Sequence, residues 1–466
     1  MGARLVTAAR LLDLSSEQRD YLGLGRRGYG AIPTCSLVEG DLDRDLLEAA
    51  VRTVVARHEP LRMRLHALDD GTLRQSFAPP DDPAVAWAES DLSEAADPLA
   101  AVLGTGVGAL DLRHEEPLRL HLLRQGERRT YVLALLDHLA TDGWGSYLFN
   151  WELWRGYRAL RHGRPPALPE LPLSYTDHLL GRHKVPPGRE RLIRDHWQAV
   201  ADRYADAGGG LPAAAPTQGR GRGDLVRDVL PESAARATAL AEGLGLSANT
   251  VPLACLLLAA WSLGERDSVA LSFIYAGRDR PATRSLVGVF HRHVPLVVDD
   301  VPAGSLADLL RKVADGVLEG VRRSRPPYSA RLFSELLAER GATPGIKLLY
   351  NQVDATFGRA RRGSARQLDD RSTARFVDSH FWPGRWHGYH EPTLRLVVGG
   401  GEAPTIQAIY NDGRLAETDA VALVDRMAAL LRAMAPEAAE RSVREFVETE
   451  TVRGLPSEAP RTPVGE

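Results

Sequence analysis

The sequence contains only two cysteines, Cys35 and Cys255, which lie far apart in apolar surroundings. A disulfide framework is therefore not expected, and the composition favours a reducing cytoplasm. Long hydrophobic runs are also missing: no window approaches the roughly 18 apolar residues that a membrane span needs, and residues 1–10 hold no stretch typical of a signal peptide. We therefore expect a cytoplasmic protein that is neither membrane-embedded nor exported.

An excess of positive charge is absent as well. The 58 Lys and Arg residues are balanced by 61 Asp and Glu residues, which gives a formal net charge of −3 at pH 7. A polybasic surface for nucleic acid or for a membrane is accordingly not expected. This balance favours a small-molecule or protein-tethered substrate.

The chain does contain enough apolar sequence to bury large cores. Of its 466 residues, 44% are hydrophobic and 26% are charged, which is ordinary for a globular protein. A chain of this length is longer than one that usually folds around a single hydrophobic core, so two domains are expected. The clearest boundary signal is a Gly-, Pro- and Ala-rich loop at residues 208–223, and the tail of residues 452–466 is expected to be disordered.

Hydrophobic periodicity predicts a mixture of helices and strands in both halves, hence an α/β fold of the α+β type. An irregular polar start precedes a strand at residues 34–38. Residues 41–43, Asp-Leu-Asp, can cap a helix that Pro60 ends, before a strand at 62–65. The further expected helices are 144–160, 190–204, 232–243, 250–263, 305–322, 329–339 and 417–434, and the further expected strands are 131–136, 269–275, 293–298, 346–353, 394–398 and 406–410.

One short string carries the chemistry. Residues 137–143 read Asp-His-Leu-Ala-Thr-Asp-Gly and follow directly on the strand at 131–136. A strand that ends at a histidine can aim a base, because imidazole titrates near neutral pH. The acid of a tight Asp-Gly turn points back into the protein, where a buried partner can hold it. We therefore expect His138 to be catalytic and Asp142 to support it.

This string resembles the HHxxxDG motif of the condensation domains of nonribosomal peptide synthetases, which belong with chloramphenicol acetyltransferase in one acyltransferase superfamily. Asp137 stands where the motif has its first histidine. Other motifs of the family are matched in its order, except that Arg292 stands where asparagine is common. They are LSxxQ at residues 14–18, RHExLR at 57–62, YxD at 175–177, GR…GxFxNxLPL at 277–296 and YN at 410–411.

The resemblance implies an architecture. It consists of two chloramphenicol acetyltransferase-like lobes, residues 1–180 and residues 181–451, arranged as a V-shaped pseudo-dimer around a central tunnel. The carrier-tethered donor would enter from one face and the acceptor from the other. His138 would lie midway along the tunnel.

The resemblance also assigns site residues. His138 corresponds to the active histidine, Asp142 to the structural acid and Arg278 to the arginine that pairs with it, in a buried pair bridging the histidine loop to the second lobe. Gly143 corresponds to the glycine whose backbone lies near the reacting carbonyl, and Asn351 to a residue on the acceptor side. A covalent nucleophile is not needed, because a thioester carbonyl is already activated.

The residues next to His138 allow more than one interpretation. A carboxylate at Asp137 would order the loop or tune the imidazole, and it would equally fit a divergent member whose task is recognition. Trp144, directly after the motif, is a candidate for substrate contact or loop tuning. The backbone at the start of the following helix is placed to donate to an oxyanion.

Other clusters favour an ordinary explanation. His291, His293 and the histidines at 380, 387 and 390 have no standard zinc-site spacing, so no metal is expected. The aromatic residues at 381–389 are expected to pack or to line the tunnel. The arginine-rich segment 359–366 is expected to be a solvated loop, with docking of an acidic carrier protein or its phosphopantetheine phosphate as the alternative.

Three functions fit the sequence. The first is a free-standing condensation enzyme of natural-product biosynthesis, such as that of antibiotics, which transfers an acyl or aminoacyl group from a carrier protein's phosphopantetheine thioester to an amine or hydroxyl acceptor. The second is an O-acyltransferase that modifies a small molecule with acyl-CoA or a carrier thioester. The third is a catalytically inactive platform that recruits a carrier protein or a tailoring enzyme. Asp137 favours the third, whereas His138, Asp142 and Gly143 favour the first two, and we expect the first.

Overall fold

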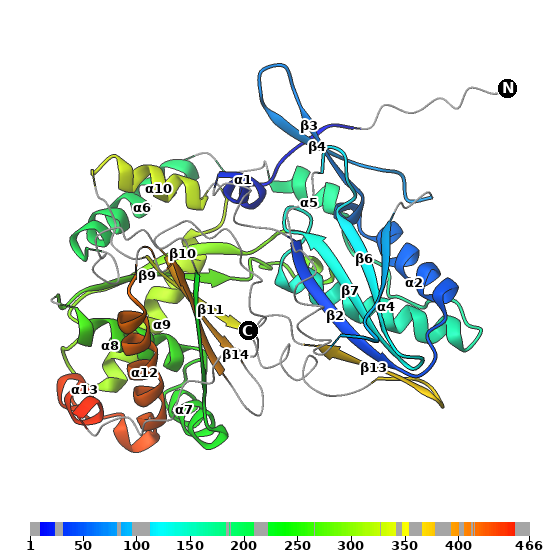
Figure 1. Cartoon of the computed structure of the whole chain (residues 1–466). Coiled ribbons are helices and arrows are strands. Elements are labelled where there is room, and N and C mark those ends of the chain that lie inside the picture. Colours follow the sequence, from blue (N-terminus) through cyan, green and yellow to red (C-terminus); the bar gives the residue numbers. More distant parts are fainter. Residues whose placement is uncertain are drawn as a thin grey trace. The chain divides into compact units, whose positions relative to one another are not determined.

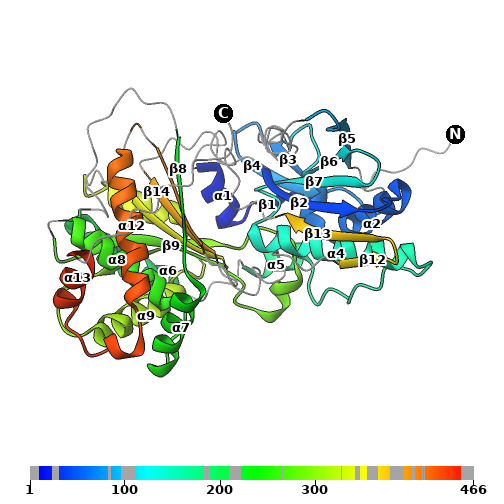
Figure 2. The same ribbon diagram turned by 60° about the horizontal axis from the view of Figure 1, so that its bottom comes forward.

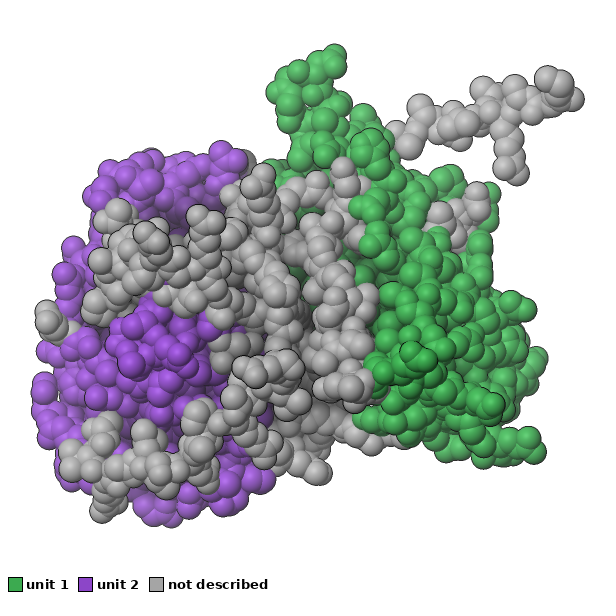
Figure 3. All heavy atoms as spheres, viewed as in Figure 1, with its two compact units in different colours: residues 1–185, 276–291, 360–388 green, residues 186–275, 292–359, 389–466 purple. Residues whose placement is uncertain are grey.

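The computed structural model describes residues 10–23, 31–81, 85–95, 112–182, 186, 188–208, 222–264, 266–326, 328–341, 347–353, 366–377, 393–399, 405–411, 413 and 415–452. The chain divides by its contacts into two compact units (Figure 3). Unit 1 comprises Met1–Val185, Ala276–His291 and Ala360–Gly388, and unit 2 comprises Pro186–Tyr275, Arg292–Arg359 and Tyr389–Glu466. By this division, unit 1 includes three segments that the sequence assigned to the C-terminal lobe, residues 181–185, 276–291 and 360–388.

Unit 1 is built on a mixed sheet. Its elements are β1 (Leu12–Asp13), α1 (Ser16–Gly23), β2 (Ala31–Glu39), α2 (Arg44–Arg57), the 3-10 turns Glu59–Arg62 and Pro281–Ser285, β3 (Met63–Ala67), β4 (Leu73–Phe77), β5 (Ala86–Asp91), β6 (Leu118–Gln125), β7 (Arg129–Asp137), α4 (Gly143–Arg161), α5 (Tyr175–Arg182), β12 (Arg366–Asp369) and β13 (Ser372–Val377). Within the described residues the main sheet has the order β12-β13-β2-β7-β6-β5, and a small sheet has the order β1-β4-β3.

Burial on both faces explains the continuous apolar sequence of β7. The helices α2 and α4 cover one face (Figure 1), where Leu47 and Phe149 pack against Val132 and Leu136 of β7. Leu133 of β7 points to the other face and belongs to a separate cluster with residues of β2. Because successive strand residues alternate between faces, a strand covered on both sides is apolar at nearly every position. This buried strand delivers His138 at its end.

Unit 2 has a second mixed sheet. Its elements are α6 (Arg189–Asp206), β8 (Arg222–Asp228), α7 (Pro231–Gly243), α8 (Thr250–Leu263), β9 (Val269–Tyr275), β10 (Arg292–Val298), α9 (Leu306–Arg323), α10 (Ala330–Ala338), β11 (Lys347–Val353), β14 (Thr393–Gly399), β15 (Thr405–Asn411), α12 (Glu417–Ala433), the 3-10 turn Pro436–Ala438 and α13 (Val443–Val452). The order of the described strands is β10-β9-β11-β14-β15-β8.

The helix α8 forms the centre of unit 2. Its residues from Thr250 to Ala260 are all buried, which explains why it is apolar all round. It lies beside α12 against the sheet (Figure 2), and both helices contribute to one large core. The helix α9 packs on the same core, and a capping box of Ser305 and Asp308 forms its N-terminus.

The mixture of helix and sheet in both units confirms the predicted α/β class. The predicted elements of the second half are all present. The helix α2 begins after the predicted capping segment 41–43, of which Asp43 is the N-cap and accepts hydrogen bonds from the amides of Asp45 and Leu46. The prediction of an irregular polar start was wrong, because the helix α1 lies in that part of the chain. The elements α5, α13, β1, β4, β5, β6, β8, β12 and β13 were not predicted.

Several expectations fall outside the described part of the chain. They concern the tail after residue 452, the arginine-rich residues 359–365, and the aromatic and histidine residues 380–390. In the described helices, none is long and apolar enough to cross a membrane.

Candidate functional site

His138 follows the last residue of β7, and its ring is held in a defined orientation. The residue before it, Asp137, is paired with Ala31 of β2, so the sheet fixes the backbone up to the histidine. His138 is buried, with 8% of its surface exposed, and its Nδ1 lies 3.0 Å from the carbonyl oxygen of Thr141. A carbonyl only accepts, so Nδ1 carries the proton and Nε2 of the neutral ring carries the lone pair. Nε2 is therefore the basic atom.

Asp142 is the N-cap of α4 and organises the turn behind the histidine. Its Oδ1 accepts a 2.8 Å hydrogen bond from the amide of Gly145, and its Oδ2 accepts a 3.0 Å bond from the amide of Phe290. Its own amide donates to the carbonyl of Gly288. The carboxylate is thus satisfied inside the protein and stays away from solvent, as expected of a structural acid.

Arg278 pairs with Asp142. One guanidinium nitrogen lies 2.9 Å from Oδ1 of the carboxylate, and the other donates to the carbonyls of Thr283 and Leu286. Burial lowers the pKa of Arg278, and the charge of Asp142 opposes this effect. The pair is buried as expected, but it does not link two units, because the segment that carries Arg278 belongs to unit 1.

Tyr21, which the sequence did not single out, and His291 lie against the ring of His138. The hydroxyl of Tyr21 is 2.7 Å from Nε2 of His138 and 3.0 Å from Nε2 of His291. Tyr21 comes from α1, and His291 from the end of the segment that carries Arg278. We expected His291 to be an ordinary polar or packing residue, and its position beside His138 makes it part of the candidate site.

The helix α1 is anchored to the histidine loop by Gln18. The side-chain amide of Gln18 donates to the carbonyl of Leu139 at 3.0 Å and exchanges hydrogen bonds with the side chain of Gln75. Ser15 and Gln18 form a reciprocal capping box at the start of α1. The sequence Ser-x-x-Gln is a known helix-start signal, so the helix could have been found.

Asp137 and Trp144, the candidates for loop tuning, are both engaged with backbone. The Asp137 carboxylate accepts a 2.8 Å hydrogen bond from the amide of Leu139, which orders the first turn of the loop. The indole of Trp144 donates to the carbonyl of Arg284 at 2.9 Å and lies against the Arg278 guanidinium. These contacts hold the loop together.

Gly143 and Asn351 lie in different units. Gly143 is the first residue of α4, where a backbone amide has no acceptor within its own helix. Asn351 lies in β11 of unit 2 and is half-buried. It alternates with Tyr350, which packs in the core, so Asn351 points to the opposite face of that sheet.

His58, from the RHExLR motif, connects elements that surround the site. Nε2 of His58 lies 2.9 Å from the carboxylate of Glu152 in α4, and its Nδ1 accepts from the amide of Val287. Burial lowers the pKa of His58, and the bond to Glu152 partly offsets this effect. His58 thus joins α2, α4 and the segment of Arg278. Tyr175 of the YxD motif packs edge-on against Phe290 in the same segment.

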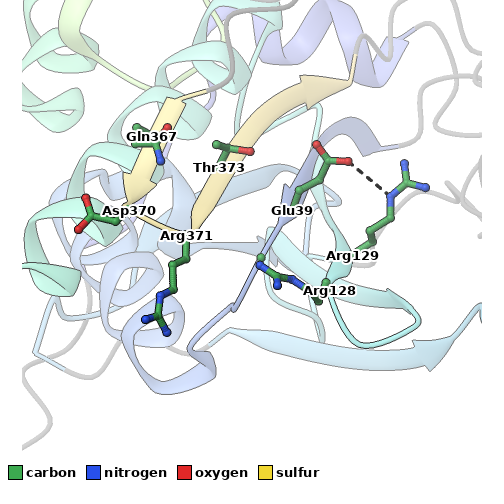
Figure 4. Close-up of a pocket in the computed structure, with 8 residues that line it drawn as sticks. Glu39, Arg128, Arg129, Gln367, Asp370, Arg371 and Thr373 are labelled. Atoms are coloured by element: carbon green, nitrogen blue, oxygen red, sulfur yellow. Dashed lines mark ion pairs between the residues drawn. The ribbon is translucent and has the colours of Figure 1, made fainter.

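A surface pocket of about 420 Å³ lies elsewhere in unit 1 (Figure 4). It is lined by Glu39, Gly40, Arg128, Arg129, Gln367, Asp370, Arg371 and Thr373. Glu39 is 3.6 Å from Arg129, and the two residues are paired at the end of β2 and β7 opposite to Asp137. Eight residues of extended strand separate the two ends by roughly 26 Å. The pocket is therefore not part of the histidine site. Among the described residues, no group of three His, Cys, Asp or Glu side chains is placed to hold a metal.

Comparisons with known sequences agree on one family. A model of the condensation domain matches residues 29–344. Phosphinothricin tripeptide synthetase PhsB of Streptomyces viridochromogenes is 32% identical over 326 residues, covering 67% of this chain and 27% of that protein. A dimodular nonribosomal peptide synthase of Bacillus subtilis is 28% identical over 295 residues, covering 61% of this chain and 12% of that protein. The chain thus spans only a minor part of these relatives.

Solved structures show the same fold. The first condensation domain of the calcium-dependent antibiotic synthetase, in complex with substrate analogue 3a, matches with a TM-score of 0.73 and 20% identity, covering 94% of this chain and 99% of that one. The X-domain from teicoplanin biosynthesis matches with a TM-score of 0.72 and 19% identity, covering 95% and 99%. These matches confirm the predicted fold class.

Proposed function

The chain belongs to the condensation domain family, and on that premise we propose that it joins an acyl or aminoacyl group to an amine or hydroxyl acceptor in nonribosomal-peptide-type biosynthesis. The donor is a thioester on the phosphopantetheine arm of a carrier protein, and the product is an amide or an ester. The observation that carries the proposal is the buried imidazole of His138, whose Nδ1 is held by the carbonyl of Thr141 so that Nε2 is the proton acceptor.

The reaction requires one proton to move. As the acceptor's nitrogen or oxygen attacks the thioester carbon, Nε2 of His138 takes its proton. The new C–N or C–O bond forms, the C–S bond breaks, and the leaving thiolate recovers the proton from the imidazolium. The bond from Nδ1 to Thr141 keeps the ring oriented and stabilises the imidazolium while it exists.

The start of α4 is our candidate for stabilising the oxyanion. The amide of Gly143 has no acceptor in its own helix, and the partial positive charge of a helix N-terminus favours a developing negative charge. Asp142 and Arg278 fix this turn, through the bond of Asp142 to the Gly145 amide and through the ion pair of the two side chains. They are positioning residues, because both carboxylate oxygens of Asp142 and the two terminal nitrogens of Arg278 are bonded to protein groups.

A reconstituted assay tests the proposal. An acyl-loaded carrier protein is offered to the protein with a panel of amines and alcohols, and product is followed by mass spectrometry. We expect His138→Ala to lower the rate by about 10²- to 10⁴-fold, the usual contribution of a general base. His162→Ala, at an exposed histidine that ends α4, is the matched control. Equal rates for wild type and His138→Ala would contradict base catalysis. Acyl-CoA in place of the carrier tests the O-acyltransferase alternative.

The inactive platform is the second candidate. It is favoured by the hydroxyl of Tyr21, which occupies the Nε2 of His138 in this structure, and by Asp137 in place of the family's first histidine. Under this alternative, no variant forms product from any acceptor, whereas the loaded carrier still binds to the wild type in a pull-down.

A further inference from the structure

Tyr21 joins two imidazoles through one hydroxyl. Its oxygen lies 2.7 Å from Nε2 of His138 and 3.0 Å from Nε2 of His291. Since the Nδ1 proton of His138 is directed to Thr141, Nε2 of His138 must accept, so the Tyr21 hydroxyl donates to it. The same oxygen can then accept a hydrogen bond from Nε2 of His291.

The bond from Tyr21 occupies the atom that the reaction needs. An imidazole nitrogen has a single lone pair, which lies in the plane of the ring, and it accepts one strong hydrogen bond at a time. An amine or hydroxyl acceptor must donate its proton to this same lone pair. The acceptor and Tyr21 therefore compete for one position.

Tyr21 is held in this place by its own helix. Gln18, one turn earlier on the same face of α1, donates to the carbonyl of Leu139, and the capping box of Ser15 fixes the start of the helix. Tyr21 itself is buried, with 7% of its surface exposed. Rotation of the Tyr21 side chain can break the bond to His138 while α1 stays anchored to the loop.

We propose that Tyr21 is a gate on the acceptor position, a positioning residue that covers Nε2 of His138 until an acceptor displaces it. The hydrogen bond to His291 retains the displaced hydroxyl near the site. This inference rests on the proposed condensation reaction, and it limits the acceptor to compounds whose N–H or O–H replaces a phenol as the donor to Nε2.

The kinetic test is Tyr21→Phe, which keeps the ring and removes only the hydroxyl. The Michaelis constant for the acceptor should fall by about two- to tenfold, because a net hydrogen bond no longer has to be broken. The Michaelis constant for the loaded carrier should not follow it. A merely structural tyrosine would not separate the two constants. An acceptor constant that stays the same or rises overturns the gate.

A second measurement needs no reaction. Diethyl pyrocarbonate acylates unprotonated imidazole nitrogens, and peptide mass spectrometry locates the modified histidine. We expect His138 to react severalfold faster in Tyr21→Phe than in the wild type, and faster also in His291→Ala, where Tyr21 loses its second bond. Tyr157→Phe is the matched control, since that buried hydroxyl of the same unit bonds the amide of Asp43 instead.

The two measurements separate the gate from the proposed function. Unchanged reactivity of His138 in Tyr21→Phe overturns the gate, whatever the assay yields. Faster modification together with a lower Michaelis constant for the acceptor supports both. Faster modification without product from any variant overturns the condensation reaction, and the acceptor gate with it, but not the hydrogen bond.

Discussion

The side-chain amide of Gln18 donates a 3.0 Å hydrogen bond to the backbone carbonyl of Leu139, the residue directly after His138. This bond joins α1 to the histidine loop across 121 positions of sequence. Because Gln18 is fully buried and also bonds Gln75, its position is determined on both sides. The Ser-x-x-Gln segment at the start of α1 thus holds the loop that carries His138.

Replacement of Gln18 by Leu should therefore destabilise the protein. The substitution keeps the volume but removes the partner of the Leu139 carbonyl and one of the two partners of the Gln75 side chain, at a cost of about 1–3 kcal/mol for buried polar groups. Urea unfolding followed by circular dichroism measures the loss. Gln198→Leu, on the exposed face of α6, is the control and should change the free energy of unfolding by less than about 0.5 kcal/mol. A Gln18 variant as stable as this control would show that the bond contributes nothing.

Arg278→Met should be more damaging. It leaves the buried carboxylate of Asp142 without its cation, and breaking such a pair costs about 3–5 kcal/mol. Asp142→Asn should reduce the damage when combined with Arg278→Met, since no charge then remains in the site. The free energy of unfolding of the four proteins of this double-mutant cycle gives the coupling energy. Strictly additive losses would mean that the two side chains do not depend on each other.

The sequence predicted the elements on either side of His138 better than the long-range contacts of its ring. The strand before His138 and the helix after it are marked by local periodicity, and Asp142 by its Asp-Gly turn. His291 is 270 positions away from Tyr21, and no local pattern predicts that contact. β13 likewise joins β2 from the far end of the chain, because strand pairing depends on the fold as a whole. The missed helix α1 is different, since its Ser-x-x-Gln start is a local signal.

The role of Asp137, which stands where the family motif has a histidine, can be tested by substitution. Its carboxylate accepts from the amide of Leu139, and the amide oxygen of an asparagine can accept the same bond. We expect Asp137→Asn to retain most of the condensation rate and Asp137→Ala to lose several-fold more, because only the latter opens the turn. Rates in the reconstituted assay decide. An Asp137→Asn variant as slow as Asp137→Ala would show that the charge matters, not the turn.

The buried pair of His58 and Glu152 predicts how stability depends on pH. Burial lowers the pKa of His58 below its ordinary value near 6.5, so the folded state binds fewer protons there than the unfolded chain does. The stability from this group is complete above about pH 6.5 and falls as the pH drops from that value toward the lowered pKa.

The variant His58→Gln tests this dependence. It cannot titrate, yet its amide can still donate to Glu152. The melting temperature of this variant should therefore fall less between pH 7 and pH 5 than that of the wild type. The exposed residue His162, changed to Gln, should leave the wild-type dependence intact. Parallel pH curves for wild type and His58→Gln would mean that His58 titrates alike in the folded and unfolded states, contrary to its burial.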